Sequence, residues 1–188
     1  YRKIAAINTA QQDLNTISVP DKLCIGEGGA GKNPDVAQKL YAERKEDVLD
    51  FLRDSFGETF DRVFICAGAG GGSGAGTVSP LVDSALELQK MVKCKSQKIG
   101  VILALPMISE GSKVNSNAFQ TLSKVWKLLE EGKVSPLILL DNEKINRLYP
   151  NLAVGPFWQT ANSSITGLFH LFNLTSARDS SYSAFDSN

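Results

Sequence analysis

The chain has 188 residues with 43% hydrophobic and 21% charged side chains, a composition typical of one folded domain and unlike a disordered chain. Its 20 basic residues balance 20 acidic ones, which argues against nucleic acid as a partner of the whole surface. No apolar run approaches the roughly 20 residues that cross a bilayer, so we expect no membrane insertion. Cys24, Cys66 and Cys94 lack CxxC spacing, which favours free thiols in a reducing cytoplasm.

Strands and helices are predicted to alternate along the chain. We expect strands at 3–7, 21–25, 63–66, 99–105 and 136–140. We expect helices at 34–55, 78–93, 112–131, 144–148 and about 156–173. The continuous apolar run at 99–105 is typical of a strand that is covered on both faces. The alternation predicts an α/β fold, with a Rossmann-like parallel sheet, right-handed crossovers and helices on both faces.

A glycine-rich run at 67–77 separates an apolar strand from a helix and dominates the sequence. Glycines let backbone N–H groups approach a ligand without a Cβ in the way. The first turn of the helix that follows leaves unpaired N–H donors and a partial positive charge. Ser73 and Thr77 add hydroxyl donors. The order of strand, glycine turn and helix therefore predicts an anion site suited to phosphates.

Further polar loops follow the other predicted strands. In a parallel sheet the loops at the carboxyl ends of the strands gather at one edge and form the ligand site. The loops in question are 8–12, 26–33, 67–77, 106–111 and 141–143. Two are glycine-rich, and the others carry Asn, Gln, Glu or Asp. We therefore expect a phosphate-bearing ligand to lie along this edge.

Four of these loops match known motifs in the same order. The GGGSGAG of 70–76 resembles the GGGTGTG signature of the tubulin superfamily, and GGAGKNP of 28–34 resembles the GAGANPE-type loop of FtsZ. The NTAQQ of 8–12 is similar to the NTDAQ loop of FtsZ, and LDNE of 140–143 is similar to the DNEA segment of tubulin. The chain thus resembles the GTPase domain of the tubulin/FtsZ superfamily, which includes plasmid and phage tubulin-like filament proteins.

The resemblance implies that the ligand is GTP or GDP, with the 68–77 loop around the phosphates and the 28–33 loop over the γ-phosphate. It places Glu110 near the ribose and Asn142 on a guanine-reading Asn. Trp158 and Asn162 keep the spacing of the family's base-stacking aromatic and second guanine-reading Asn, and positions i and i+4 share one helix face. The implied nucleotide contacts are Asn8, Gln11, Gly28, Gly29, Ala30, Gly31, Asn33, Gly68, Ala69, Gly70, Gly71, Gly72, Ser73, Gly74, Glu110, Asn142, Trp158 and Asn162.

Hydrolysis in the family is completed between subunits, by an acidic loop that follows the central helix. The matching stretch here is 181–186, in which Asp186 is the expected catalytic residue. Ser181 and Ser183 replace an Asn and an Asp of the family pattern, and Ala10 replaces an acid of the NTD loop. These departures bear on the hydrolysis rate more than on nucleotide binding.

The resemblance also implies a domain organisation. Residues 1–173 correspond to the GTPase domain, with a central helix at about 156–173, and 174–188 begin the acidic loop that leads to a C-terminal domain. We expect the family's first strand and its glycine loop to precede Tyr1 in a longer protein; the alternative is a protein that binds nucleotide poorly.

The sequence therefore predicts a cytoplasmic, GTP-binding and GTP-hydrolysing protein that polymerises head to tail with itself, with adaptor proteins as possible further partners. Magnesium should accompany the triphosphate, because it neutralises charge on the β- and γ-oxygens. No protein-held metal is expected, since the single histidine, His170, lacks a second His or Cys at ligand spacing.

Two alternatives remain open. The first is a non-polymerising nucleotide-binding regulator of the same fold. The second is a Rossmann-type dinucleotide enzyme, which predicts an acidic residue at the end of the next strand to hold a ribose. That strand ends here in Leu105-Pro106, which disfavours the dinucleotide enzyme.

Overall fold

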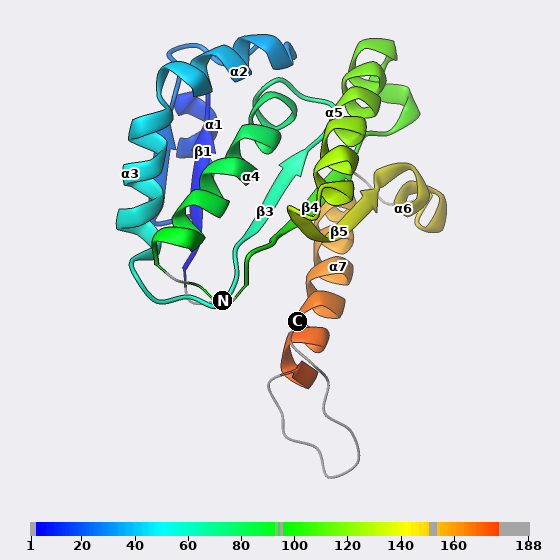
Figure 1. Ribbon diagram of the computed structural model, residues 1–188. Helices are drawn as coiled ribbons and strands as arrows, with labels where there is room; N and C mark the ends of the chain where they lie inside the picture. The colour runs from blue at the N-terminus through cyan, green and yellow to red at the C-terminus, as the bar shows by residue number, and fades with distance from the viewer. Residues whose placement is uncertain (1–2, 93, 95, 151–153, 177–188) are drawn as a thin grey trace. The chain divides into compact units, whose positions relative to one another are not determined.

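The computed structural model describes residues 3–92, 94, 96–150 and 154–176, and divides the chain into two compact units, Tyr1–Leu139 and Leu140–Asn188. The first unit contains β1 (Ala5–Asn8), α1 (Gln11–Asn15), β2 (Asp21–Cys24), α2 (Pro34–Glu43), α3 (Lys45–Phe56), β3 (Phe64–Gly68), α4 (Ser73–Met91), β4 (Ile99–Leu105), the 3₁₀ helix η1 (Ile108–Glu110), α5 (Ser112–Glu130) and most of β5 (Val134–Asp141) (Figure 1). The second unit contains α6 (Asn142–Leu148) and α7 (Val154–Ser176).

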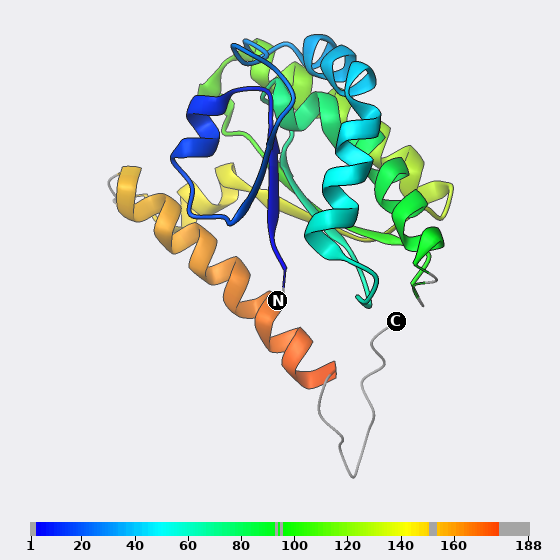
Figure 2. The ribbon, with the colours of Figure 1, turned by 90° about the vertical axis from the view of Figure 1, so that its left-hand side faces the viewer.

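The described strands confirm the α/β class, but they form two sheets where we expected one. β1 pairs in parallel with β2 along its whole length. β3 pairs in parallel with β4, with Gly68 opposite Ala104, and β5 lies on the other side of β4. Figure 2 shows the short helix α1 beside the end of β1, in the stretch that we expected to be a polar turn.

Helix α4 is the central element of the first unit. It contacts α2, α3, α5 and β3, and Figure 1 shows it between α3 and β3. One apolar core lies where α4 and α5 cover β3 and β4; its fully buried members include Val78, Val82, Ile99, Val101, Leu103 and Val125. A second core joins α2, α3 and the end of β2 to α4 through Ile25, Tyr41, Val48, Leu52 and Leu88. The two cores therefore fix α4, whose N-terminus begins at the glycine run.

The start of α4 differs from our prediction. We expected the helix to begin at Val78, but it begins at Ser73, and its first turns include Gly74 and Gly76 although glycine has a poor helix propensity. A Cβ at Gly76 would overlap the carbonyl oxygen of Pro34, and one at Gly74 would lie 2.7 Å from the Gly68 oxygen. Close packing against α2 and β3 thus requires glycine inside the first turns and overrides the propensity.

The predicted helix at 34–55 is two helices in the structure. Asn33 accepts a hydrogen bond from the Asp35 N–H at 3.1 Å and Pro34 occupies the first turn, so the predicted start is confirmed. The first helix, α2, ends at Glu43. Arg44 follows with a φ of −113° and a ψ of 21°, and α3 begins at the next residue. The acidic residues Glu46 and Asp47 favour a new helix N-terminus there, through their attraction to its partial positive charge.

The remaining boundaries moved less. β4 spans the residues that we predicted, whereas β3 starts one residue later and ends two residues later than expected. β5 is longer at both ends, and α6 starts two residues earlier because the Asp141 carboxylate caps the Lys144 N–H at 3.0 Å. The 181–186 stretch, with Ser181, Ser183 and Asp186, lies outside the described residues.

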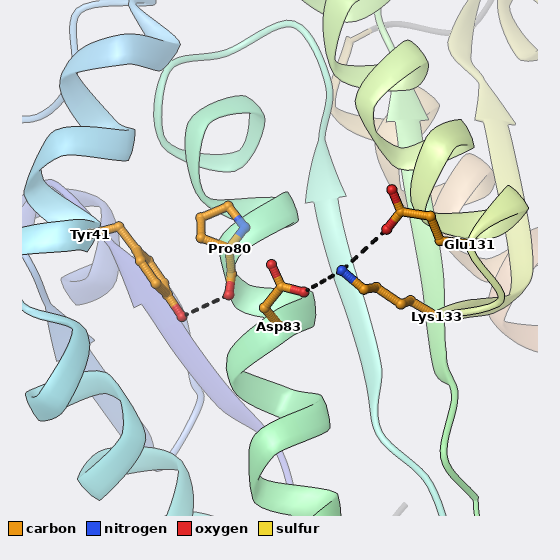
Figure 3. A network of polar contacts seen from close by, with 5 residues as sticks. All are labelled: Tyr41, Pro80, Asp83, Glu131 and Lys133. Carbon is orange, nitrogen blue, oxygen red and sulfur yellow. Dashed lines mark hydrogen bonds and ion pairs between the residues drawn. The ribbon is translucent and has the colours of Figure 1, made fainter.

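Polar contacts hold α2 and the end of α5 to α4. Figure 3 shows the Tyr41 hydroxyl near the carbonyl oxygen of Pro80, 3.4 Å away, and the same hydroxyl makes a shorter hydrogen bond to Ser84 Oγ at 2.7 Å. Burial raises the pKa of Tyr41 from 10.0 to about 12, so its hydroxyl stays protonated and can donate. On the surface, Lys133 Nζ pairs with Asp83 at 3.1 Å and Glu131 at 3.2 Å.

Within the described ranges, none of the helices combines the length and the apolar character that crossing a membrane requires.

Candidate functional site

The turn between β3 and α4 is compressed on two sides and open on a third. A Cβ at Gly70 would overlap Val114 of α5, and one at Gly72 would lie 2.7 Å from the Ala30 Cβ. Between them, a Cβ at Gly71 would meet no atom within 4 Å, and Gly71 is exposed. The backbone at Gly71 is therefore the accessible part of the turn, while its neighbours are held by packing.

The N-terminus of α4 adds positive potential beside this open backbone. The helix has 19 residues and no acidic residue in its first turn. Its unpaired first-turn N–H groups and its dipole favour an anion at that end. Within the described residues, the N–H groups of Gly70 and Gly71 donate to no protein acceptor. The turn thus has the unpaired donors and the positive end of a helix dipole that an anion site requires.

Asn8 ties the loop after β1 to the start of α4. Its Oδ1 accepts from the Thr9 N–H at 2.7 Å, from the Ala10 N–H at 3.2 Å and from Ser73 Oγ at 3.0 Å. The Ser73 hydroxyl also lies 2.6 Å from Thr9 Oγ1, and Thr9 is fully buried. Asn8 and Ser73, both predicted as ligand contacts, therefore organise two of the loops that make the site.

The second glycine loop lies against the first. Gly29 donates its N–H to the Thr9 carbonyl at 3.0 Å, and Asn33 donates to the Ala30 carbonyl at 2.8 Å. Gly29 and Gly31 have φ of 82° and 55°, which glycine adopts without strain. Added Cβ atoms at Gly28 and Gly31 would meet nothing within 4 Å. The loop thus has a packed side, at Ala30, and an open side.

Two polar residues of α5, missed by the sequence analysis, hold both glycine loops. Asn117 Nδ2 donates to the Lys32 carbonyl at 3.0 Å and to the Gly70 carbonyl at 3.2 Å. Thr121 Oγ1 lies 3.1 Å from the Ala69 carbonyl oxygen and 2.8 Å from the Asn117 carbonyl oxygen of its own helix, and its single hydrogen is shared between these two acceptors. Both side chains sit on the buried stripe of an amphipathic helix, where a polar residue needs a specific partner. That placement was the signal available in the sequence.

Comparison with known families identifies the family to which this chain belongs. The model of the Tubulin/FtsZ family, GTPase domain, matches residues 1–150. The chain belongs to the tubulin/FtsZ family.

Individual tubulin/FtsZ relatives agree in sequence over most of the chain. The cell division protein FtsZ of Aquifex aeolicus is 32% identical over 151 residues, which cover 78% of this chain and 36% of that protein. The tubulin-like protein TubZ of Bacillus cereus is 25% identical, over 94% of this chain and 41% of TubZ. The chain therefore spans less than half the length of these relatives.

Solved structures of the tubulin/FtsZ family share the fold. An FtsZ dimer from M. jannaschii has a TM-score of 0.66 at 27% identity, covering 90% of this chain and 47% of that one. CetZ2 from Haloferax volcanii, solved as a GTPγS-bound protofilament, has a TM-score of 0.80 at 19% identity, covering 96% and 51%.

Two residues that the tubulin/FtsZ resemblance assigned to the nucleotide have only local contacts. Gln11 Nε2 donates to Asn15 Oδ1 at 3.0 Å on the surface of α1. Glu110 Oε1 accepts from the Met107 N–H at 2.8 Å and so closes its own loop. Within the described residues, no hydrogen bond joins either side chain to the glycine loops.

The residues assigned to the guanine ring lie in the second unit. Asn142 is 9% exposed in the first turn of α6. Trp158 is 39% exposed and Asn162 is also exposed, and both belong to α7, where their spacing of four puts them on one helix face. Among the described residues, no cluster of His, Cys, Asp and Glu could hold a metal ion.

Proposed function

We propose that this chain binds GTP and GDP at the loops that follow β1, β2 and β3. The observation that carries the proposal is the turn at Gly71, where open backbone with unengaged N–H groups adjoins the N-terminus of α4 in a GTPase-domain family. The unpaired donors and the helix dipole favour phosphate oxygens. Mg²⁺ would enter with the triphosphate, held by its oxygens, and would neutralise charge on them.

Base selection is assigned to the second unit as part of the same proposal. Asn142 and Asn162 can each present a donor and an acceptor, as the edge of guanine requires. Trp158 supplies an aromatic face within one turn of Asn162. Glu110 and Gln11 are proposed to reach the ribose and the phosphates by giving up their present local hydrogen bonds, which Glu110 makes within its own loop and Gln11 makes along α1.

A nucleotide panel tests the binding proposal. The full-length protein is incubated with GTP, GDP, ATP or NAD, each with Mg²⁺, and its thermal unfolding is recorded. A ligand that binds the folded state raises the unfolding temperature with its concentration, so GTP and GDP should raise it and ATP and NAD should not. A larger shift with NAD than with GTP would support a dinucleotide enzyme and end the GTP proposal.

The proposal extends to assembly. We propose that the protein forms head-to-tail polymers in the cytoplasm. Such polymers would place the acidic loop of one subunit at the nucleotide of the next, where Asp186 would orient the attacking water. Family membership and the match to an FtsZ dimer support self-association. Asp186→Ala should leave GTP affinity unchanged and reduce turnover at least tenfold in a phosphate-release assay, a loss of about 1.4 kcal/mol or more in transition-state stabilisation.

Sedimentation separates the filament proposal from the regulator. Nucleotide-dependent pelleting with GTP, but not with GDP, supports polymerisation. GTP binding without assembly at any concentration would instead favour a non-polymerising regulator. The reason to consider a regulator is that Ser181 and Ser183 replace an Asn and an Asp of the family pattern.

A further inference from the structure

Asn117, on the buried face of α5, is the polar side chain that joins the two glycine loops. It is 8% exposed, on the face of α5 that otherwise contributes Val114, Ala118, Val125 and Leu128 to burial. Its amide nitrogen has two hydrogens, and each goes to a different loop: one to the Lys32 carbonyl and one to the Gly70 carbonyl. A buried amide with this pattern connects segments that lie 38 positions apart in sequence, from 32 to 70.

The second contact comes from the next turn of the same helix. Thr121 is 2% exposed, and its hydroxyl lies 3.1 Å from the Ala69 carbonyl and 2.8 Å from the Asn117 carbonyl, so it supports the turn less strongly than Asn117 does. The carbonyls of two successive peptide units, at Ala69 and Gly70, are therefore both turned toward α5. In a planar trans peptide the N–H points opposite to the C=O. The N–H groups of Gly70 and Gly71 are consequently directed away from α5.

The loop that receives the other hydrogen of Asn117 needs support for its shape. Lys32 is the described residue other than glycine with a positive φ, 57°, a region that costs an ordinary side chain of order 1 kcal/mol. Its carbonyl is the acceptor of Asn117. Asn33, the next residue, caps α2. Asn117 thus stabilises the bend at Lys32 at the point where the loop joins its helix.

We propose that Asn117, supported by Thr121, is a positioning residue that sets the direction of the phosphate-binding N–H groups and the spacing of the two glycine loops. It touches no nucleotide; it acts through the carbonyls that it holds. The proposal rests on the proposed function for its ligand, a nucleoside diphosphate or triphosphate. We call the two hydrogen bonds from Asn117 to the glycine loops the Asn117 clamp. Because this clamp joins both loops, we expect it to strengthen the binding of a triphosphate, which would reach both loops, more than that of a diphosphate.

Affinity is the first test, with the full-length protein, Asn117→Ala and the milder Thr121→Val, titrated with GTP, GDP and GMP in a calorimeter. Asn117→Ala removes two hydrogen bonds, so the GTP dissociation constant should rise about tenfold, the GDP constant less, and the GMP constant little. Thr121→Val should move the same constants in the same order by about threefold. Tyr41→Phe, which removes a buried hydroxyl donor elsewhere in the first unit, is the matched control and should leave all three constants unchanged.

A purely structural role would lower stability, or the fraction of binding-competent protein, and would therefore weaken the binding of GTP, GDP and GMP by the same factor. Equal losses for GTP, GDP and GMP, or the same loss in Tyr41→Phe, would overturn the proposal.

Hydrogen exchange without nucleotide gives a second test that does not depend on GTP. Asn117→Ala should accelerate exchange in peptides covering 28–33 and 69–73 together, relative to wild type and Tyr41→Phe. Unchanged exchange in both peptides would refute the clamp even if GTP binds. Wild-type protein that binds no guanine nucleotide would refute the proposed function, while accelerated exchange in both loops would still support the clamp.

Discussion

Two kinds of glycine alternate along the turn between β3 and α4. Gly70, Gly72, Gly74 and Gly76 are required by packing, because a Cβ at each would come within 2.7 Å of a neighbour or closer. Gly71 faces open space, as do the glycines at 28 and 31 in the neighbouring loop. The difference teaches that a glycine-rich motif combines two functions: most of its glycines seat the helix, and a few expose backbone to a ligand.

Substitution of a packing glycine should have the largest effect. Gly76→Ala places a methyl group against the Pro34 carbonyl and the Ala37 Cβ, both of which belong to α2. Since backbone cannot yield as a flexible side chain does, we expect a loss of about 3 kcal/mol in the free energy of unfolding. Urea denaturation measures it, with Gly71→Ala as the matched control at about 0.5 kcal/mol or less. Equal losses at the two positions would remove the distinction between the two kinds of glycine.

Substitution of the open glycine should reverse the pattern. Gly71→Val leaves the fold intact, because its side chain has room and its φ is not in the left-handed region. The branched side chain would occupy the space proposed for the phosphates, so GTP affinity should fall at least tenfold, about 1.4 kcal/mol or more. Calorimetric titration with GTP measures the effect. Full GTP affinity in a folded Gly71→Val protein would show that the ligand does not lie over this backbone.

Ser73 lies between the packed and open parts, so its removal should affect both properties moderately. Ser73→Ala deletes the hydroxyl that contacts Asn8 Oδ1 and Thr9 Oγ1. We expect stability to fall by about 1.5 kcal/mol and GTP affinity to fall with it. Ser123→Ala on the exposed face of α5, whose hydroxyl bonds only the Phe119 carbonyl, is the control and should change neither. A Ser73→Ala protein as stable as wild type would mean that this network contributes nothing.

The smallest expected effect lies away from the turn and carries a pH signature. Tyr41→Phe should reduce stability by about 1 kcal/mol below pH 10, through loss of the bond to Ser84. Burial raises the folded-state pKa of Tyr41 to about 12 from 10.0, so the unfolded state releases the proton first as the pH rises. The Tyr41 contribution should therefore be complete below pH 10 and lost as the pH approaches 12. Wild type and Tyr41→Phe should converge over that range in denaturation curves; a constant difference would contradict this.

The sequence predicted the elements whose signals are local. The apolar run of β4 and the Asn33-Pro34 start of α2 depend on neighbouring residues alone, and both were found as predicted. The predicted start of α4 was wrong because Gly74 and Gly76 are required by contacts with β3 and α2, and the local sequence does not reveal these contacts. The break at Arg44 was missed because no glycine or proline marks it in the sequence, and Tyr41 before it and Val48 after it are both buried in the second core.

The residues of the candidate site also divide into those that the local sequence predicts and those that it does not. Loop positions such as Asn8 and Ser73 could be singled out from strand ends and glycine spacing, and the structure joins them by hydrogen bonds. Asn117 and Thr121 were missed because their acceptors lie on loops distant in sequence. Gln11 and Glu110 remain predictions that rest on the family resemblance, as do Asn142, Trp158 and Asn162.

The central claim is that exposed backbone at Gly71, seated by its packed neighbours, receives the phosphates of a guanine nucleotide. A parallel calorimetric titration of GTP into full-length wild type and Gly71→Val, both shown to be folded by circular dichroism, tests it most directly. Saturable binding by wild type with a dissociation constant at least tenfold lower than that of Gly71→Val is the predicted result. No binding by wild type, or identical constants for both proteins, would contradict it.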